Sequence, residues 1–75
     1  MEYELKSKQE IGFAIRRARE RRGYSQSQLA LAIGYTHPGA DAYIRKFESG
    51  RSYPPYERIR AIHEILGIEY DELIP

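Results

Sequence analysis

The stretch from Gly23 to Gly50 constrains the fold more than any other part of the sequence. A basic helical pattern ends at Gly23, and Ser25 and Gln28 have the Ser-x-x-Gln spacing of a capping box that begins a second helix. Gly34 ends that short helix, and a third helix ends at Gly50. Two short helices joined by a tight glycine turn form a helix-turn-helix, a geometry whose second helix fits the major groove of DNA.

Helical periodicity extends over the rest of the chain and predicts an all-α fold. Pro54 and Pro55 predict a loop that leads into a fourth helix, Gly67 ends that helix, and Leu73 with Ile74 suggests a short final one. We therefore expect a compact bundle of about five short helices, forming a single domain over residues 1–75 with a helix-turn-helix core at about 25–50. The expected core residues are Ile11, Ile15, Ala18, Leu29, Ile33, Ile44, Phe47, Ile59, Ile62 and Leu66.

Charge is unevenly distributed along the chain. The sequence has 12 Lys and Arg against 11 Asp and Glu, a formal net charge of +1. Positive charge is spread over the first sixty residues, whereas residues 61–75 contain four acids and no Lys or Arg. Such a molecule can bind a polyanion through one basic face despite its small net charge, although charge alone equally suits an ordinary solvated surface.

Several function classes lack sequence support. There is no cysteine, and the two histidines, His37 and His63, are far apart, so we expect no metal site. No Gly-rich phosphate loop or acid–base constellation is present, so we expect no enzyme, no cofactor and no small-molecule ligand. The apolar runs are too short for a membrane span and the first residues lack a signal-peptide pattern, which favours a cytoplasmic protein.

The ordered motifs make the chain resemble the phage-repressor and Cro-type (XRE-type) helix-turn-helix family over roughly residues 11–74. In that family the second helix opens with Ser-Gln, has a small residue where the two helices cross, and ends in a glycine turn. The family also closes its third helix with an aromatic-Glu-x-Gly signature and pairs that glutamate with an arginine of the first helix. The matching residues here are Ser25, Gln26, Ala30, Gly34, Phe47, Glu48, Ser49, Gly50 and Arg19.

One segment departs from the family pattern. Fifteen residues separate Gly34 from Gly50, where the compact pattern has about eleven, and the surplus lies in residues 35–41. Thr36 could cap a third helix lengthened by about one turn. Alternatively, residues 35–40 form a longer loop, with Asp41 as the N-cap and the helix starting at Ala42.

The resemblance implies a site on double-stranded DNA. Arginine and lysine can donate to guanine, and alanine can meet a thymine methyl group. Asp41 suits a cap better than a base reader, because phosphates repel a carboxylate that does not accept from cytosine. Tyr43 suits equally well the DNA contact and the cover of the helix joint. The implied base-reading positions are Asp41, Ala42, Tyr43, Arg45 and Lys46. The implied phosphate-binding positions are Gln26, Ser49, Arg51, Tyr53 and Tyr56. Arg19 and Glu48 are expected to form a mostly buried structural ion pair.

The resemblance implies a small sequence-specific transcriptional regulator, a repressor that binds an operator as a homodimer. The apolar positions of the C-terminal helices are the expected self-association surface: Ile65, Leu66, Ile68, Leu73 and Ile74. The alternative is a protein-interaction module of the same fold, of the antitoxin or co-activator type.

Overall fold

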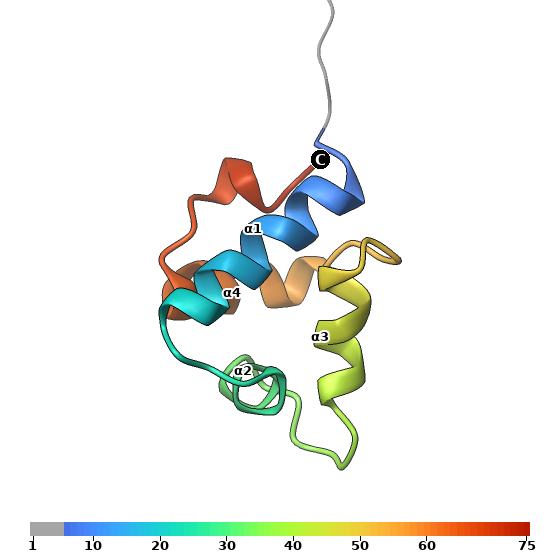
Figure 1. Ribbon diagram of the computed structural model, residues 1–75, viewed down its shortest axis with the longest axis vertical. Helices are drawn as coiled ribbons and strands as arrows, with labels where there is room; N and C mark the ends of the chain where they lie inside the picture. Colours follow the sequence, from blue (N-terminus) through green and yellow to red (C-terminus); the bar gives the residue numbers. More distant parts are fainter. Residues whose placement is uncertain (1–5) are drawn as a thin grey trace, which may run out of the picture.

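The computed structural model describes residues 6–75, and this part of the chain is all-helical, as predicted. Four α-helices are followed by one 3₁₀ turn (Figure 1): α1 (Lys8–Arg21), α2 (Gln26–Ala32), α3 (Asp41–Glu48), α4 (Tyr56–Leu66) and η1 (Tyr70–Glu72). Residues 1–5, on which the leader prediction largely depends, lie outside the described part. Within residues 6–75, no helix is both long and apolar enough to cross a membrane.

Two capping boxes begin the first two helices. Ser25 caps α2 as predicted, accepting from the Gln28 backbone at 3.0 Å while the Gln28 side chain accepts from the Ser25 backbone at 2.8 Å. Ser7 and Glu10 do the same for α1, at 3.1 and 3.0 Å. Each box satisfies two backbone N–H groups that have no partner inside the helix.

Residues 35–40 form a loop, so an extended third helix is ruled out. Gly39 has a φ of +80°, a left-handed conformation that cannot continue an α-helix, and α3 begins two residues later. The expectation that Asp41 is the N-cap is wrong by one residue. Ala40 occupies that position, without a side-chain cap, and Asp41 is the first helical residue.

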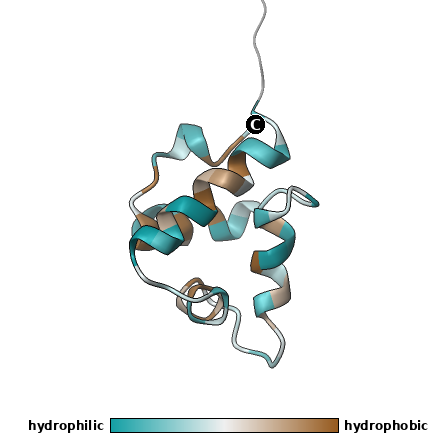
Figure 2. Ribbon diagram, viewed as in Figure 1, coloured by the Kyte–Doolittle hydropathy of each residue, from teal (hydrophilic) through white to brown (hydrophobic). Residues whose placement is uncertain are grey.

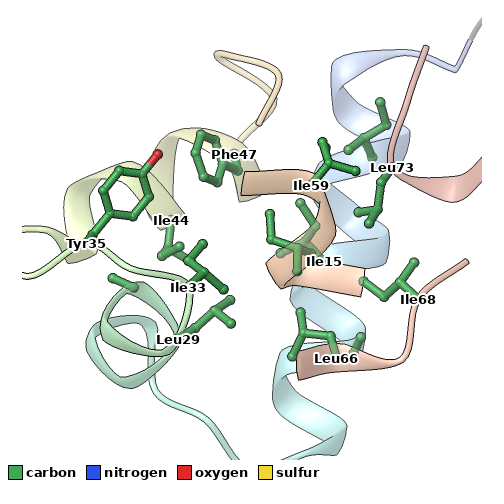
Figure 3. Packing of buried hydrophobic residues seen from close by; sticks show 14 of the residues in the cluster. Ile15, Leu29, Ile33, Tyr35, Ile44, Phe47, Ile59, Leu66, Ile68 and Leu73 are labelled. Atoms are coloured by element: carbon green, nitrogen blue, oxygen red, sulfur yellow. The ribbon is translucent and has the colours of Figure 1, made fainter. Parts of the chain in front are cut away.

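The core lies where α1 meets the other helices, and every core residue predicted from periodicity is buried. Figure 3 shows Leu29, Ile33 and Ile44 close together on the helix-turn-helix side. Ile15 lies nearer to α4 and to the C-terminal segment 67–75, called the tail below. The hydrophobic part of α1 is visible at the centre of the molecule in Figure 2. This packing fixes α3 along one side of the molecule, with one long face outside the core.

The helices α1 and α3 approach closely at Gly12. A Cβ atom at this position would lie 2.2 Å from the backbone oxygen of Phe47 and 2.9 Å from that of Glu48. No side chain fits in this space, so glycine allows α3 to pack directly on the α1 backbone.

The predicted self-association surface is wrong in three of its five residues. Leu66, Ile68 and Leu73 are buried within the chain's own core, because the segment after Gly67 folds back over α1 and α4. Ile65 is partly buried, and only Ile74 is exposed, at 39%. These residues need cover from water, as the sequence indicated, but most of them are covered within the chain itself.

Candidate nucleic-acid interface

The helix α3 has one buried face and one open face. Ile44 and Phe47, three residues apart, point into the core. Arg45, Lys46 and Ser49 are exposed on the other side. Two of these three side chains are cationic, and the open face belongs to the helix that the motif places in the major groove.

Five of the predicted DNA-binding residues come together on this face. They line one shallow hollow: Ala42, Arg45, Lys46, Ser49 and Arg51. An adjoining hollow connects this face to the start of α2, since Gln26 lines it together with Arg45 and Ser49. Three of the five candidate base readers and three candidate phosphate ligands therefore form one continuous surface across α2 and α3.

Arg45 is paired within its own helix. Its guanidinium donates through one terminal nitrogen to the carboxylate of Asp41, one helical turn earlier. The Arg45 side chain is 58% exposed and that of Asp41 is 29% exposed. Arg45 therefore does not project freely from α3. Its remaining N–H donors are still available, because a guanidinium has five.

A largely buried ion pair between Arg19 and Glu48 lies at the C-terminal end of α3, beside the hollow that Gln26 and Arg45 line. Arg19 donates to both carboxylate oxygens, through Nε at 2.6 Å and through a terminal nitrogen at 3.0 Å. The two side chains are only 12% and 6% exposed. These hydrogen bonds raise the pKa of Arg19 above its ordinary value, so it remains charged. The pair joins α1 to the C-terminal end of α3.

Gln26 and Tyr24 complete the hydrogen bonding of this ion pair. The Gln26 amide donates to Glu48 at 3.2 Å, and the Tyr24 carbonyl accepts from Arg19 at 2.8 Å. Gln26 is thus partly occupied by a structural contact, with one amide hydrogen and its carbonyl oxygen left for other partners.

Tyr43 is turned away from the open face of α3. Its ring stacks on Tyr35 with centroids 4.3 Å apart and planes 3° apart. The guanidinium of Arg58, from α4, lies 4.4 Å from the Tyr35 centroid and donates to the Ile33 carbonyl at 3.1 Å. Of the two roles open to Tyr43, the structure shows the packing one, and Arg58 is a supporting residue that sequence reasoning missed.

Tyr53 and Tyr56 lie apart from the main cluster. Tyr53 is 39% exposed and has the Lys8 ammonium 5.4 Å from its ring. Tyr56 is 87% exposed and lines a different hollow, between α4 and the tail, together with Tyr70 and Ile74. Neither tyrosine is among the residues that line the two hollows around α3.

The comparisons with known proteins agree with this geometry. A family model described as helix-turn-helix matches residues 15–73, so the chain belongs to the XRE-type helix-turn-helix family. Membership supports a DNA-binding helix-turn-helix regulator. Searches of the curated proteins and of the solved structures gave no significant match. In the described part of the chain, no three His, Cys, Asp or Glu side chains are grouped as metal ligands would be.

Proposed function

We propose that this protein is a sequence-specific transcriptional repressor that reads a double-stranded DNA operator with α3 in the major groove, acting in the cytoplasm. The observation that supports this most is the hollow on α3, where Arg45, Lys46 and Arg51 place three cations around Ala42. Cationic donors beside a small apolar side chain suit the acceptor atoms and methyl groups of base edges.

Arg45 and Lys46 are the proposed base readers. Asp41 holds one terminal nitrogen of Arg45, which leaves the other donors of that guanidinium for guanine O6 and N7. Asp41 is then a positioning residue, because its carboxylate is neutralised by Arg45 and need not meet the DNA. Ala42 lies beside both readers and leaves room for a thymine methyl group.

Phosphates are bound around the edge of the same surface. Ser49 is the C-cap of α3 and Arg51 lies two residues after it, and both are exposed. Gln26 contributes its remaining amide hydrogen from the start of α2. Phosphate contacts set the register of the protein on the duplex, and the base contacts provide the sequence preference.

A homodimer is part of the proposal, through a revised surface. Tyr56, Tyr70 and Ile74 are exposed apolar groups that line one hollow between α4 and the tail. None of these residues belongs to α2 or α3, so a second copy could bind here while both recognition helices meet successive half-sites. A charge placed in this hollow, Ile74→Glu, should shift the protein toward monomer in sedimentation equilibrium.

The decisive test is selection of bound sites from a random duplex pool with the purified protein. A symmetric consensus supports the proposal, and no enrichment overturns it in favour of a protein-interaction module. Each variant, Arg45→Ala and Lys46→Ala, should then lose about 1–3 kcal/mol of binding free energy on the consensus, concentrated at one base pair per half-site.

The matched control is Arg17→Ala. Arg17 lies on α1, where its guanidinium is 5.6 Å from the Phe13 ring, and it lines a hollow against the tail. This change removes the same charge as Arg45→Ala, so it should weaken all sequences slightly without altering base preference. A uniform loss for Arg45→Ala, like that of the control, would show that Arg45 does not read bases.

A further inference from the structure

The loop between α2 and α3 is built as an ordered structure. Its two ends are anchored in the core, since Tyr35 is 9% exposed and Ala40 is 6% exposed. The residues between them, 36–39, are all exposed. Figure 1 shows this loop projecting beyond the end of α3 where the helix begins.

An aromatic cluster fixes the position of His37 within the loop. The His37 ring lies edge-on to Tyr35, with centroids 6.3 Å apart, and edge-on to Tyr43, with centroids 5.4 Å apart. Tyr35 and Tyr43 stack on each other, and Arg58 packs on Tyr35. His37 is therefore held against two rings that are themselves anchored to α3 and α4, while remaining exposed.

This location places His37 at the N-terminal end of α3, where the Arg45 guanidinium meets Asp41. In a helix-turn-helix, the N-terminal residues of the recognition helix are the ones that meet base edges. The loop directly precedes Asp41, the first residue of α3, so it shares the same end of the helix. Residues 36–40 contain no carboxylate that would repel phosphates. Within residues 6–75 the structure shows no hydrogen bond from His37, so both ring nitrogens are available.

We propose that His37 is a second DNA-reading side chain, supplied by the loop rather than by α3, which hydrogen-bonds a base edge in the major groove next to the base pairs read by Arg45 and Lys46. This inference rests on the proposed function and deepens it. The additional residues of the loop would then lengthen the stretch of DNA bases that each protomer reads beyond those contacted by α3.

The discriminating variant is His37→Phe, because a phenyl ring keeps the edge-on packing on Tyr35 and Tyr43 and removes both ring nitrogens. His37→Ala removes the packing as well. The matched control is His63→Phe, the same substitution at the other histidine. His63 stacks on Tyr70 at 4.0 Å and its Nδ1 lies 2.6 Å from the Ile68 carbonyl, remote in sequence from the loop and in a different aromatic pair.

The experiment measures affinity for the selected consensus and for every single-base variant of it, at a temperature where circular dichroism shows each protein folded. His37→Phe should bind the consensus about tenfold more weakly and become tolerant of substitution at one base pair per half-site, adjacent to those affected by Arg45→Ala and Lys46→Ala. His37→Ala should show the same base preference as His37→Phe, with a lower Tm than that variant. His63→Phe should lower the Tm and leave the base preference unchanged.

The possible failures are distinguishable. If His37→Phe has the base preference and affinity of the wild type, His37 only packs and the inference is wrong. If its affinity falls equally on all sequences, His37 holds a phosphate and base reading by the loop is wrong. If the wild-type protein itself selects no site, the proposed function fails, and the inference fails with it.

Discussion

The two ends of α3 are held in place by different chemistry. At the C-terminal end, Glu48 forms a largely buried, bidentate ion pair with Arg19 of α1. At the N-terminal end, Tyr43 stacks on Tyr35, which in turn packs against Arg58 of α4. Each attachment uses an arginine from a helix outside the helix-turn-helix. The end that carries the family signature is fixed by charge, and the end beside the lengthened loop is fixed by aromatic packing.

The two attachments also differ in how fully their polar groups are satisfied. The Glu48 carboxylate receives three donor contacts, at 2.6, 3.0 and 3.2 Å, and Arg19 makes a further bond to a backbone carbonyl. Arg58 makes one hydrogen bond, and its Nε is the only buried side-chain nitrogen or oxygen without a partner among residues 6–75. A buried unpaired donor costs free energy, so the second attachment should be the weaker one.

The largest expected effect comes from breaking the ion pair. Arg19→Ala or Glu48→Ala leaves a charged partner that is largely buried and should cost about 3–5 kcal/mol of unfolding free energy. That is a large share of the stability of a domain this small. Urea unfolding measures the loss. The control is the apolar double variant Arg19→Met with Glu48→Leu, which should recover part of it. A single variant within about 0.5 kcal/mol of the wild type would show that the pair contributes little.

The next largest effect is expected at Gly12, where α3 packs closely on α1. Glycine to alanine normally stabilises a helix interior by about 1 kcal/mol. At Gly12 the sign should reverse, because the new Cβ would lie 2.2 Å from the Phe47 oxygen and must push α3 away from α1, at a cost of about 1–3 kcal/mol. Thermal unfolding distinguishes the two signs. Ser27→Ala, at an exposed position of α2, serves as the control and should change stability by less than about 0.5 kcal/mol.

A smaller effect is expected at the aromatic end. Arg58→Ala removes one hydrogen bond and one cation–π contact, at a cost of about 1–2 kcal/mol. Arg58→Met keeps the packing and removes the unpaired Nε, so it should cost less than the alanine variant. Parallel urea titrations measure both variants. A loss as large as that of Arg19→Ala would contradict the ranking of the two attachments.

The sequence predicted both partners of the first attachment but only Tyr43 of the second, for a physical reason. The capping box of Ser25 and Gln28 is encoded by residues three apart, and the partner of Glu48 followed from a family signature. The stack of Arg58, Tyr35 and Tyr43 joins positions that are distant in sequence and has no local pattern. Its members meet only after α4 has packed on the core.

The predictions for other parts of the molecule were incomplete for similar reasons. The pairing of Asp41 with Arg45 has the i, i+4 spacing of a helical ion pair, so the signal was present and was overlooked in favour of a cap. The C-terminal apolar residues were recognisable as residues that need cover. Periodicity alone could not show that the chain's own tail provides that cover.

The smallest expected effect concerns Glu10, the exposed carboxylate of the capping box that begins α1. Glu10 accepts a hydrogen bond from the Ser7 backbone at 3.0 Å, and this bond, followed by the one to the Ser7 side chain, lowers the pKa of Glu10 below its ordinary 4.5. Because the folded-state pKa is the lower one, this stabilisation is complete above the unfolded-state value. It is lost as the pH falls through the folded-state value.

The test is the Tm of the wild type and of Glu10→Gln between pH 7 and pH 3. Glutamine keeps a capping acceptor but cannot titrate, so the Tm difference between the two proteins should be constant near neutral pH and should change only below about pH 4.5. All other carboxylates are common to both proteins and cancel in the difference. The wild type should lose the larger amount in acid, and the effect should stay well below that of Arg19→Ala, because Glu10 is exposed and a single helix cap can fray without releasing α3. An equal acid response in the two proteins would mean that the Ser7–Glu10 box does not stabilise the fold in solution.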